Sequence, residues 1–167
     1  MDAYLDIETT GLSPYYSQIT VVGISAGEGR EHRLTQLVGP EVTARNIETV
    51  MAGIESLYTY NGHRFDLPFI RNRLGVDLER NFRHYDLMYD CWSRNLYGGL
   101  KAVERRLGIQ RKLPQIGGFD AVRLWRRYQT AEDLEALRLL LEYNKEDVLN
   151  LRTLRAHLAR ETRQIRR

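Results

Sequence analysis

The sequence predicts an α/β fold with one mixed β-sheet flanked by α-helices, and three observations lead to that prediction. Three strand-like segments come first, joined by short connections that contain Gly or Pro, which is typical of an antiparallel meander. A helix, a strand, a second helix and another strand then alternate, which is typical of parallel strands with helices on the sheet faces. The last part of the chain reads as helix throughout.

The meander is expected at segments 2–8, 18–25 and 31–37, which are rich in apolar and β-branched residues. The connections between them read GLSPYYS and AGEGR. Both are short enough to join neighbouring antiparallel strands. These three strands therefore form the predicted antiparallel part of the sheet.

The alternating part follows directly. Segment 43–54 carries apolar residues at helical spacing, and 56–61 is predicted as a fourth strand. Segment 67–75 is predicted as a helix that ends at its glycine, and 82–87 as a short fifth strand. These segments supply the predicted parallel strands and their flanking helices.

The C-terminal part is predicted to be helical in four segments. Thr130 with Asp133 three residues later predicts a capping box at the start of the last one. The predicted helices are 88–97, 100–108, 119–129 and a long one from Thr130 to about Arg163.

Length and composition predict one globular domain over residues 1–167, because 43% of the residues are hydrophobic and no linker or repeat interrupts the pattern. The single cysteine, Cys91, excludes an intrachain disulfide and a cysteine-based metal cluster, and we expect it to be buried and reduced. No signal peptide and no membrane-spanning run is recognised, so no membrane partner and a cytoplasmic location are expected.

The charge is unevenly distributed along the chain. Residues 1–93 carry 8 Lys/Arg and 13 Asp/Glu, whereas residues 94–167 carry 17 and 9. Most of the basic residues are Arg, which binds phosphate through a planar fork of donors. An acidic half beside a basic half suits a metal site next to a nucleic-acid track, although Arg-rich helices also serve simply to solvate a surface.

Acidic residues occur at three places where chemistry is expected. Asp6 and Glu8 are two apart on the first predicted strand, so they point to one face and repel each other unless a cation lies between them. Asp66 follows an Asn-Gly turn and opens a helix, where an N-cap role is the alternative. Tyr143 and Asp147 are four apart and share one face of the last helix.

Taken in order, these residues resemble the three motifs of the DEDD superfamily of 3′→5′ exonucleases, in its tyrosine-containing branch. DIETTGL is similar to the first motif, NGHRFD to the second and YNKED to the third. GLKAVERRLGI and GFDAVRLWRRY further resemble exonucleases of the YprB type. The resemblance covers nearly the whole chain and implies a ribonuclease H-like fold.

The resemblance also implies a catalytic and metal-binding set of Asp6, Glu8, Asp66 and Asp147, with Tyr143 orienting the attacking water. Carboxylates are the ligands of hard cations, so two divalent ions, Mg²⁺ or Mn²⁺, are the expected cofactors. Asp6 is expected to bridge both ions. With an ordinary pKa near 10, the tyrosine is not expected to act as a strong base alone.

Six further residues are candidates for substrate binding, and three of them have a plainer alternative. Thr9, Gly11 and Leu12 follow the two acids of the first motif, where the resemblance implies a seat for the terminal nucleotide, although Leu12 is equally compatible with core packing. Asn61, whose turn role is favoured, and His63 flank the second motif. Lys145 lies in the third motif, where a solvated surface lysine is the default. Asp86, not among the six, is favoured as a helix cap.

The predicted function is a 3′→5′ exonuclease that releases nucleoside 5′-monophosphates from the 3′ end of single-stranded DNA or RNA, with a replication, repair or RNA-processing protein as a possible recruiter. The alternatives are an endonuclease of the ribonuclease H type and a non-catalytic nucleic-acid-binding module of the same fold. The Tyr-x-x-x-Asp pair argues against the first alternative, and the retention of all four acids argues against the second.

Overall fold

The computed structural model describes the backbone of residues 1–29 and 31–165, and the side chains of residues 1–29 and 31–160. Five strands form one sheet in the order β3-β2-β1-β4-β5, which places β1 at its centre. Their bounds are β1 Asp2–Thr9, β2 Ile19–Glu28, β3 Glu31–Val38, β4 Ser56–Thr59 and β5 Arg83–Asp86. Arg30, in the predicted second connection, lies outside the described residues.

The sheet is mixed, as the sequence predicts. β1 pairs antiparallel with β2, and β2 antiparallel with β3, so the first three strands form the expected meander. On its other edge β1 pairs parallel with β4, and β4 parallel with β5. The β1–β2 register shifts between Glu8 and Thr9, so the regular ladder ends just past the first two acids.

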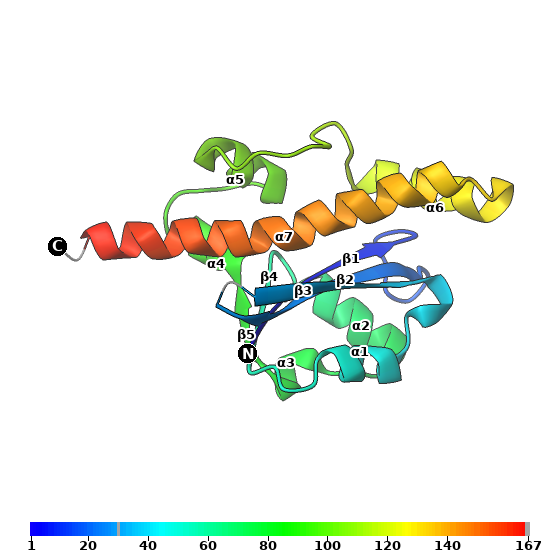
Figure 1. Ribbon diagram of the computed structural model, residues 1–167, viewed down its shortest axis with the longest axis horizontal. Coiled ribbons are helices and arrows are strands. Elements are labelled where there is room, and N and C mark those ends of the chain that lie inside the picture. Colours follow the sequence, from blue (N-terminus) through cyan, green and yellow to red (C-terminus); the bar gives the residue numbers. More distant parts are fainter. Residues whose placement is uncertain (30, 166–167) are drawn as a thin grey trace.

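Helices cover both faces of this sheet (Figure 1). One face carries α1, α2 and α3, and the other carries the long α7 together with α4, α5 and α6. Their bounds are α1 Ala44–Val50, α2 Asp66–Leu74, α3 Leu78–Asn81, α4 Leu87–Trp92, α5 Leu100–Leu107, α6 Gly118–Ala131 and α7 Leu134–Ile165, with a 3₁₀ turn at Gly39–Glu41. None of the described helices combines the length and apolar character that crossing a bilayer requires.

The alternation of β1 decides where its acids point. Ala3, Leu5 and Ile7 are buried in the core beneath α1 and α2, whereas Tyr4 packs in the core beneath α7. Successive strand side chains point to opposite faces, so Asp6 shares the face of Tyr4. The sequence therefore directs both acids of the first motif toward α7.

A glycine in β2 allows α7 to lie close to the sheet at this point. Gly23 is the register partner of Asp6. A Cβ built at Gly23 would lie 2.2 Å from the Asn144 side-chain oxygen and 2.7 Å from a Val148 methyl group. Only a residue without a side chain fits there, because real Cβ contacts are never that short.

The start of the last helix differs from the prediction. Thr130 lies inside α6, where its hydroxyl donates to the Arg126 carbonyl. The chain turns at Glu132, which has a positive φ of 51°, and the Asp133 carboxylate then accepts from the Ala136 amide at 2.9 Å. The predicted capping box was therefore wrong: Asp133 itself caps the first turn of α7.

Candidate active site

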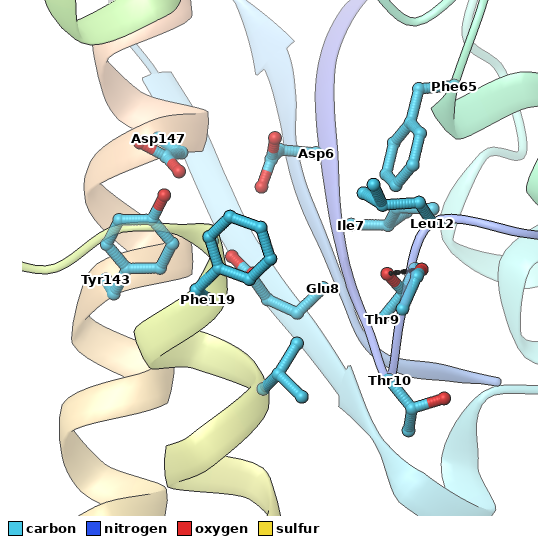
Figure 2. A pocket seen from close by; sticks show the side chains of 13 residues that line it. Asp6, Ile7, Glu8, Thr9, Thr10, Leu12, Phe65, Phe119, Tyr143 and Asp147 are labelled. Atoms are coloured by element: carbon cyan, nitrogen blue, oxygen red, sulfur yellow. Dashed lines mark hydrogen bonds between the residues drawn. The ribbon is translucent and has the colours of Figure 1, made fainter. Parts of the chain in front are cut away.

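A cavity of about 520 Å³ opens between β1, the loop that follows it, α6 and α7. Figure 2 shows its walls: acids and a tyrosine lie on one side, and apolar side chains line the rest. The lining residues are Asp6, Ile7, Glu8, Thr9, Thr10, Gly11, Leu12, Phe65, Gly118, Phe119, Val122, Tyr143 and Asp147. Residues of the first and third sequence motifs therefore line the same cavity.

Three carboxylates form a compact group in this cavity. Asp6, Glu8 and Asp147 each place an oxygen within 4.8 Å of the others. Burial, followed by the charges of its neighbours Asp147, Glu8 and Asp66, raises the pKa of Asp6 well above its usual value. Burial and nearby carboxylates raise the pKa of Glu8 in the same way. The group is therefore electrostatically unfavourable without a cation.

The donor set fits a hard divalent cation. Oε1 of Glu8 is buried and has no hydrogen-bond partner among the described residues, although a buried carboxylate oxygen normally has one. Three carboxylates that converge from a strand and a helix provide the all-oxygen ligands that Mg²⁺ and Mn²⁺ prefer. An ion held by Asp6, Glu8 and Asp147 would satisfy this oxygen and offset the repulsion.

Asp147 is held by a buried arginine. Nη2 of Arg111 donates to the Asp147 carboxylate and to Glu104 Oε1, and its Nε donates to Glu104 Oε2. The side chains of Arg111 and Glu104 are 5% and 1% exposed. This network fixes the position of the α7 acid. Burial raises the pKa of Asp147, while Arg111 acts in the opposite direction.

A second network holds Asp6. The Asn144 amide donates to the Asp6 carboxylate at 3.1 Å and to its backbone carbonyl at 3.3 Å. Gln36, on β3, donates in turn to the Asn144 oxygen at 2.9 Å and to the Leu141 carbonyl at 2.8 Å. Asn144 is completely buried, so α7, β1 and β3 are tied together behind the acids.

Asp66 lies beside the group of three but is engaged differently. It is the first residue of α2, is 4% exposed, and accepts the Ile7 backbone N–H at 3.0 Å. Burial raises the pKa of Asp66 to about 7, although the Ile7 amide opposes the shift. Phe65, and not Asp66, occupies the N-cap position, so the capping alternative is wrong. Its expected role toward a second ion stays a prediction.

Tyr143 lines the cavity one helical turn before Asp147, as the spacing predicts. Lys101 lies over its ring with Nζ 4.9 Å from the ring centre. Burial, followed by the negative charges of Asp147, Glu8 and Asp6, raises the pKa of the Tyr143 hydroxyl. The hydroxyl therefore keeps its proton and remains a hydrogen-bond donor.

Thr9, Gly11 and Leu12 line the cavity, and their contact with a nucleotide stays a prediction. The Thr9 hydroxyl donates to the Gly11 carbonyl at 2.7 Å, which shapes the loop after β1. Leu12 is 77% exposed, so the alternative that it packs in the core is wrong. Phe119 of α6 is 78% exposed and projects into the cavity between α7 and β1 (Figure 2).

The other three substrate-binding candidates do not line the cavity. Asn61 has a positive φ of 61°, which confirms its turn role, and His63 contacts Glu79. Lys145 pairs with Glu142 at 3.2 Å on the surface of α7. Substrate contacts from these residues stay predictions.

Two further predictions concern residues outside the cavity. Asp86 accepts from the Met88 amide and caps α4, as favoured by its position before the helix. Cys91 is buried, as expected.

The sequence reasoning missed five residues that shape the site: Gly23, Glu104, Arg111, Phe119 and Asn144. Arg111 lies in an irregular loop, where no periodic pattern assigns a partner. Asn144 had a usable signal, because a polar residue between Tyr143 and the apolar stripe of α7 has to be buried with a partner. Gly23 had one as well, since an isolated glycine in a strand indicates a close approach.

The sequence matches one family model and two known proteins over most of its length. A family model described as RNase_H superfamily matches residues 3–159. The uncharacterized protein YprB of Bacillus subtilis is 29% identical over 95% of this chain, and the match covers 42% of YprB. MJ0365 of Methanocaldococcus jannaschii is 30% identical over 87% of this chain and 88% of its own length. The chain thus spans less than half of YprB but most of MJ0365.

Solved structures share the fold at low sequence identity. The family B DNA polymerase of Pyrobaculum calidifontis superposes with a TM-score of 0.71 at 16% identity, covering 95% of this chain and 24% of the polymerase. NrnC of Brucella melitensis with bound Mg²⁺ superposes with a TM-score of 0.65 at 21% identity, covering 98% of this chain and 74% of NrnC. These likenesses show a shared fold, and together with the family model they confirm that it is ribonuclease H-like, as predicted.

Proposed function

This chain belongs to the RNase_H superfamily, and from that premise we propose that it is a metal-dependent 3′→5′ exonuclease that releases nucleoside 5′-monophosphates from single-stranded DNA or RNA. The observation that carries the proposal is the convergence of Asp6, Glu8 and Asp147 with Tyr143 in one cavity. A group of buried acids in a cavity, whose pKa values are raised by burial and by one another, is typical of a functional site.

The metal-binding residues are Asp6, Glu8 and Asp147, with Asp66 nearby to complete the set. Bound divalent ions would activate water and stabilise the charge that develops on the leaving oxygen. The protein holds its acids in place before any ion binds, through Arg111 on one side and Asn144 on the other. Such preorganisation avoids a cost at the moment of reaction.

Tyr143 is proposed to position the attacking water. Its hydroxyl keeps its proton because burial and the acids raise its pKa, so it donates a hydrogen bond and does not remove a proton. Loss of a single such donor typically costs about 10²–10³-fold in rate. A Tyr143→Phe variant should therefore retain the metal site and lose most of the activity.

The apolar part of the cavity is proposed to hold the terminal nucleotide. Leu12, Phe65 and Phe119 line it, and aromatic side chains stack on bases of any sequence. A binding mode based on stacking fits an enzyme that acts on successive nucleotides. The NrnC structures of Brucella melitensis include one with Mg²⁺ and one with pGG, which supports the proposed cofactor and substrate class.

The test uses 5′-labelled single-stranded DNA and RNA oligonucleotides with Mg²⁺ or Mn²⁺, resolved on a denaturing gel. The wild type should give a ladder that shortens from the 3′ end, and EDTA or Asp147→Asn should abolish it. Asp90→Asn, at an exposed acid of α4 outside the cavity, is the matched control and should cleave normally. Discrete internal cuts, or no metal-dependent cleavage at all, would refute the proposal.

A further inference from the structure

A second group of metal-ligating side chains lies outside the cavity. His63, in the turn after β4, Glu79 of α3 and His84 of β5 bring one ligand atom each within 4.8 Å of the others. None of the three lines the cavity, and none was assigned to the group of acids. The cluster joins three separate elements at the edge of the sheet.

The geometry centres on one carboxylate oxygen. Glu79 Oε1 lies 2.5 Å from His63 Nδ1 and 3.6 Å from His84 Nδ1. A tetrahedral zinc ion with bonds of about 2.0–2.2 Å needs ligand atoms about 3.3–3.6 Å apart. The observed spacings bracket this range, so small side-chain rotations are enough to admit an ion.

The surroundings of the two histidines suit metal binding. His84 is 10% exposed, and its second ring nitrogen, Nε2, lies 2.8 Å from the Thr59 hydroxyl. A hydrogen bond on that side fixes the ring and leaves Nδ1 as the ligand atom. The His63 side chain is 56% exposed, which gives an ion a path from solvent and leaves room for a water as fourth ligand.

The ligand types identify the class of ion. Two imidazoles and one carboxylate favour Zn²⁺ or a similar transition metal, whereas Mg²⁺ and Mn²⁺ prefer an all-oxygen set such as Asp6, Glu8 and Asp147. The two clusters on this chain therefore differ in the cation they select.

The cluster also touches the turn that leads to Asp66. The His63 backbone N–H donates to Asp86 Oδ2 at 3.1 Å, and the Asn61 N–H donates to Asp86 Oδ1 at 2.8 Å. An ion on the His63 ring would add a third anchor to the same turn. Asn61 adopts a positive φ there, a conformation that non-glycine residues adopt only when their surroundings stabilise it.

We propose that His63, Glu79 and His84 form a zinc-binding site, with water as the fourth ligand, that clamps the turn between β4 and α2 to α3 and β5. The site shares no ligand with the acids of the cavity, so zinc binding can be measured separately from the proposed nuclease activity. Zinc binding should stabilise the folded protein by mass action.

The experiment titrates Zn²⁺ into EDTA-treated and buffer-exchanged protein, in excess Mg²⁺ that supplies the carboxylate site. The Asp147→Asn protein is measured in parallel to separate the two sites. Calorimetry should report one Zn²⁺ equivalent in both proteins. At a hundredfold excess over Kd, the melting temperature should rise by about 5–10 °C.

The variants decide the assignment. His63→Ala and His84→Ala should no longer bind the one Zn²⁺ equivalent, and Zn²⁺ should no longer raise their melting temperature. Glu79→Gln should weaken Zn²⁺ binding at least tenfold. His157→Ala, a histidine of α7 outside the cluster, should behave as wild type. If His84→Ala unfolds, the more exposed His63 and Glu79 carry the test. Unchanged Zn²⁺ binding in His63→Ala and Glu79→Gln, or no binding by the wild type, would overturn the proposal.

Discussion

Replacement of Arg111 should destabilise the protein strongly, because Arg111 is the buried cation between two buried acids. It donates to Asp147 and Glu104, whose side chains are 10% and 1% exposed. In Arg111→Met the methylene part of the side chain is roughly preserved while the charge is lost. Two carboxylates would then remain in the interior without their partner.

The expected magnitude follows from this burial. Removal of one partner from a buried ion pair costs about 3–5 kcal/mol, because the remaining charge is desolvated and uncompensated. For a chain of this size, each kcal/mol shifts the melting temperature by about 2–4 °C. Arg111→Met should thus lower the melting temperature by about 6–20 °C in EDTA. Mg²⁺ should recover part of the loss, since a cation bound at Asp147 also offsets its charge.

Denaturant unfolding with and without Mg²⁺ measures this effect. Arg138→Met is the matched control: Arg138 pairs with Glu135 on the surface of α7, both side chains being over 60% exposed. Exposed pairs contribute about 0–1 kcal/mol, so the control should unfold almost as the wild type. If Arg111→Met costs no more than Arg138→Met, the buried network does not exist in solution and the reasoning is refuted.

Three further predictions concern the cavity. In EDTA, the free energy of unfolding should decrease as the pH rises from about 4 to about 7. Burial raises the pKa of Asp66 from 3.8 to about 7, so over this range the folded state retains a proton that the unfolded state has already lost. Thermal unfolding across this window checks the slope, which Asp66→Asn should reduce; an unchanged slope would contradict the shift. Asp6→Asn should raise the melting temperature of the EDTA-treated protein by about 2–4 °C, because it removes one of the repelling charges, and it should abolish stabilisation by Mg²⁺, because it removes a proposed ligand. Scanning calorimetry tests both effects, and a lower melting temperature in EDTA would count against mutual repulsion. Phe119→Ala should raise KM for oligonucleotides about 5–150-fold, because base stacking on an aromatic ring contributes about 1–3 kcal/mol, and it should leave the melting temperature unchanged, because the ring is exposed. Steady-state kinetics measures KM, with Tyr97→Ala, at another exposed aromatic residue, as the control. Equal KM values in the two variants would exclude stacking on Phe119.

The parts of the fold predictable from sequence are those with a strong local signal. The apolar and β-branched composition of the first three segments and the short Gly- and Pro-containing connections predicted the meander. The i, i+2 spacing of Asp6 and Glu8 and the i, i+4 spacing of Tyr143 and Asp147 predicted which side chains share a face. These local rules hold because backbone geometry alone fixes the direction of each side chain.

The rest depends on contacts between segments far apart in the chain. Arg111 and Asp147 are 36 residues apart, and no spacing rule joins a loop residue to a helix acid at that distance. Asp66 illustrates the same limit, since its sequence position suggested a cap, whereas its carboxylate accepts an amide from β1. The short helix α3, which supplies Glu79, has only four residues and was not recognised. Four residues are too few for a periodic pattern to be visible.

The most direct test of the central claim compares linear and circular forms of one single-stranded oligonucleotide in Mg²⁺, with the linear form labelled at its 3′-terminal nucleotide. An exonuclease built on Asp6, Glu8 and Asp147 should release that label as a nucleoside 5′-monophosphate from the linear strand and leave the circle intact. Asp147→Asn should release no label and should also leave the circle intact. Cleavage of the circle, or release of label by Asp147→Asn at the wild-type rate, would contradict the account.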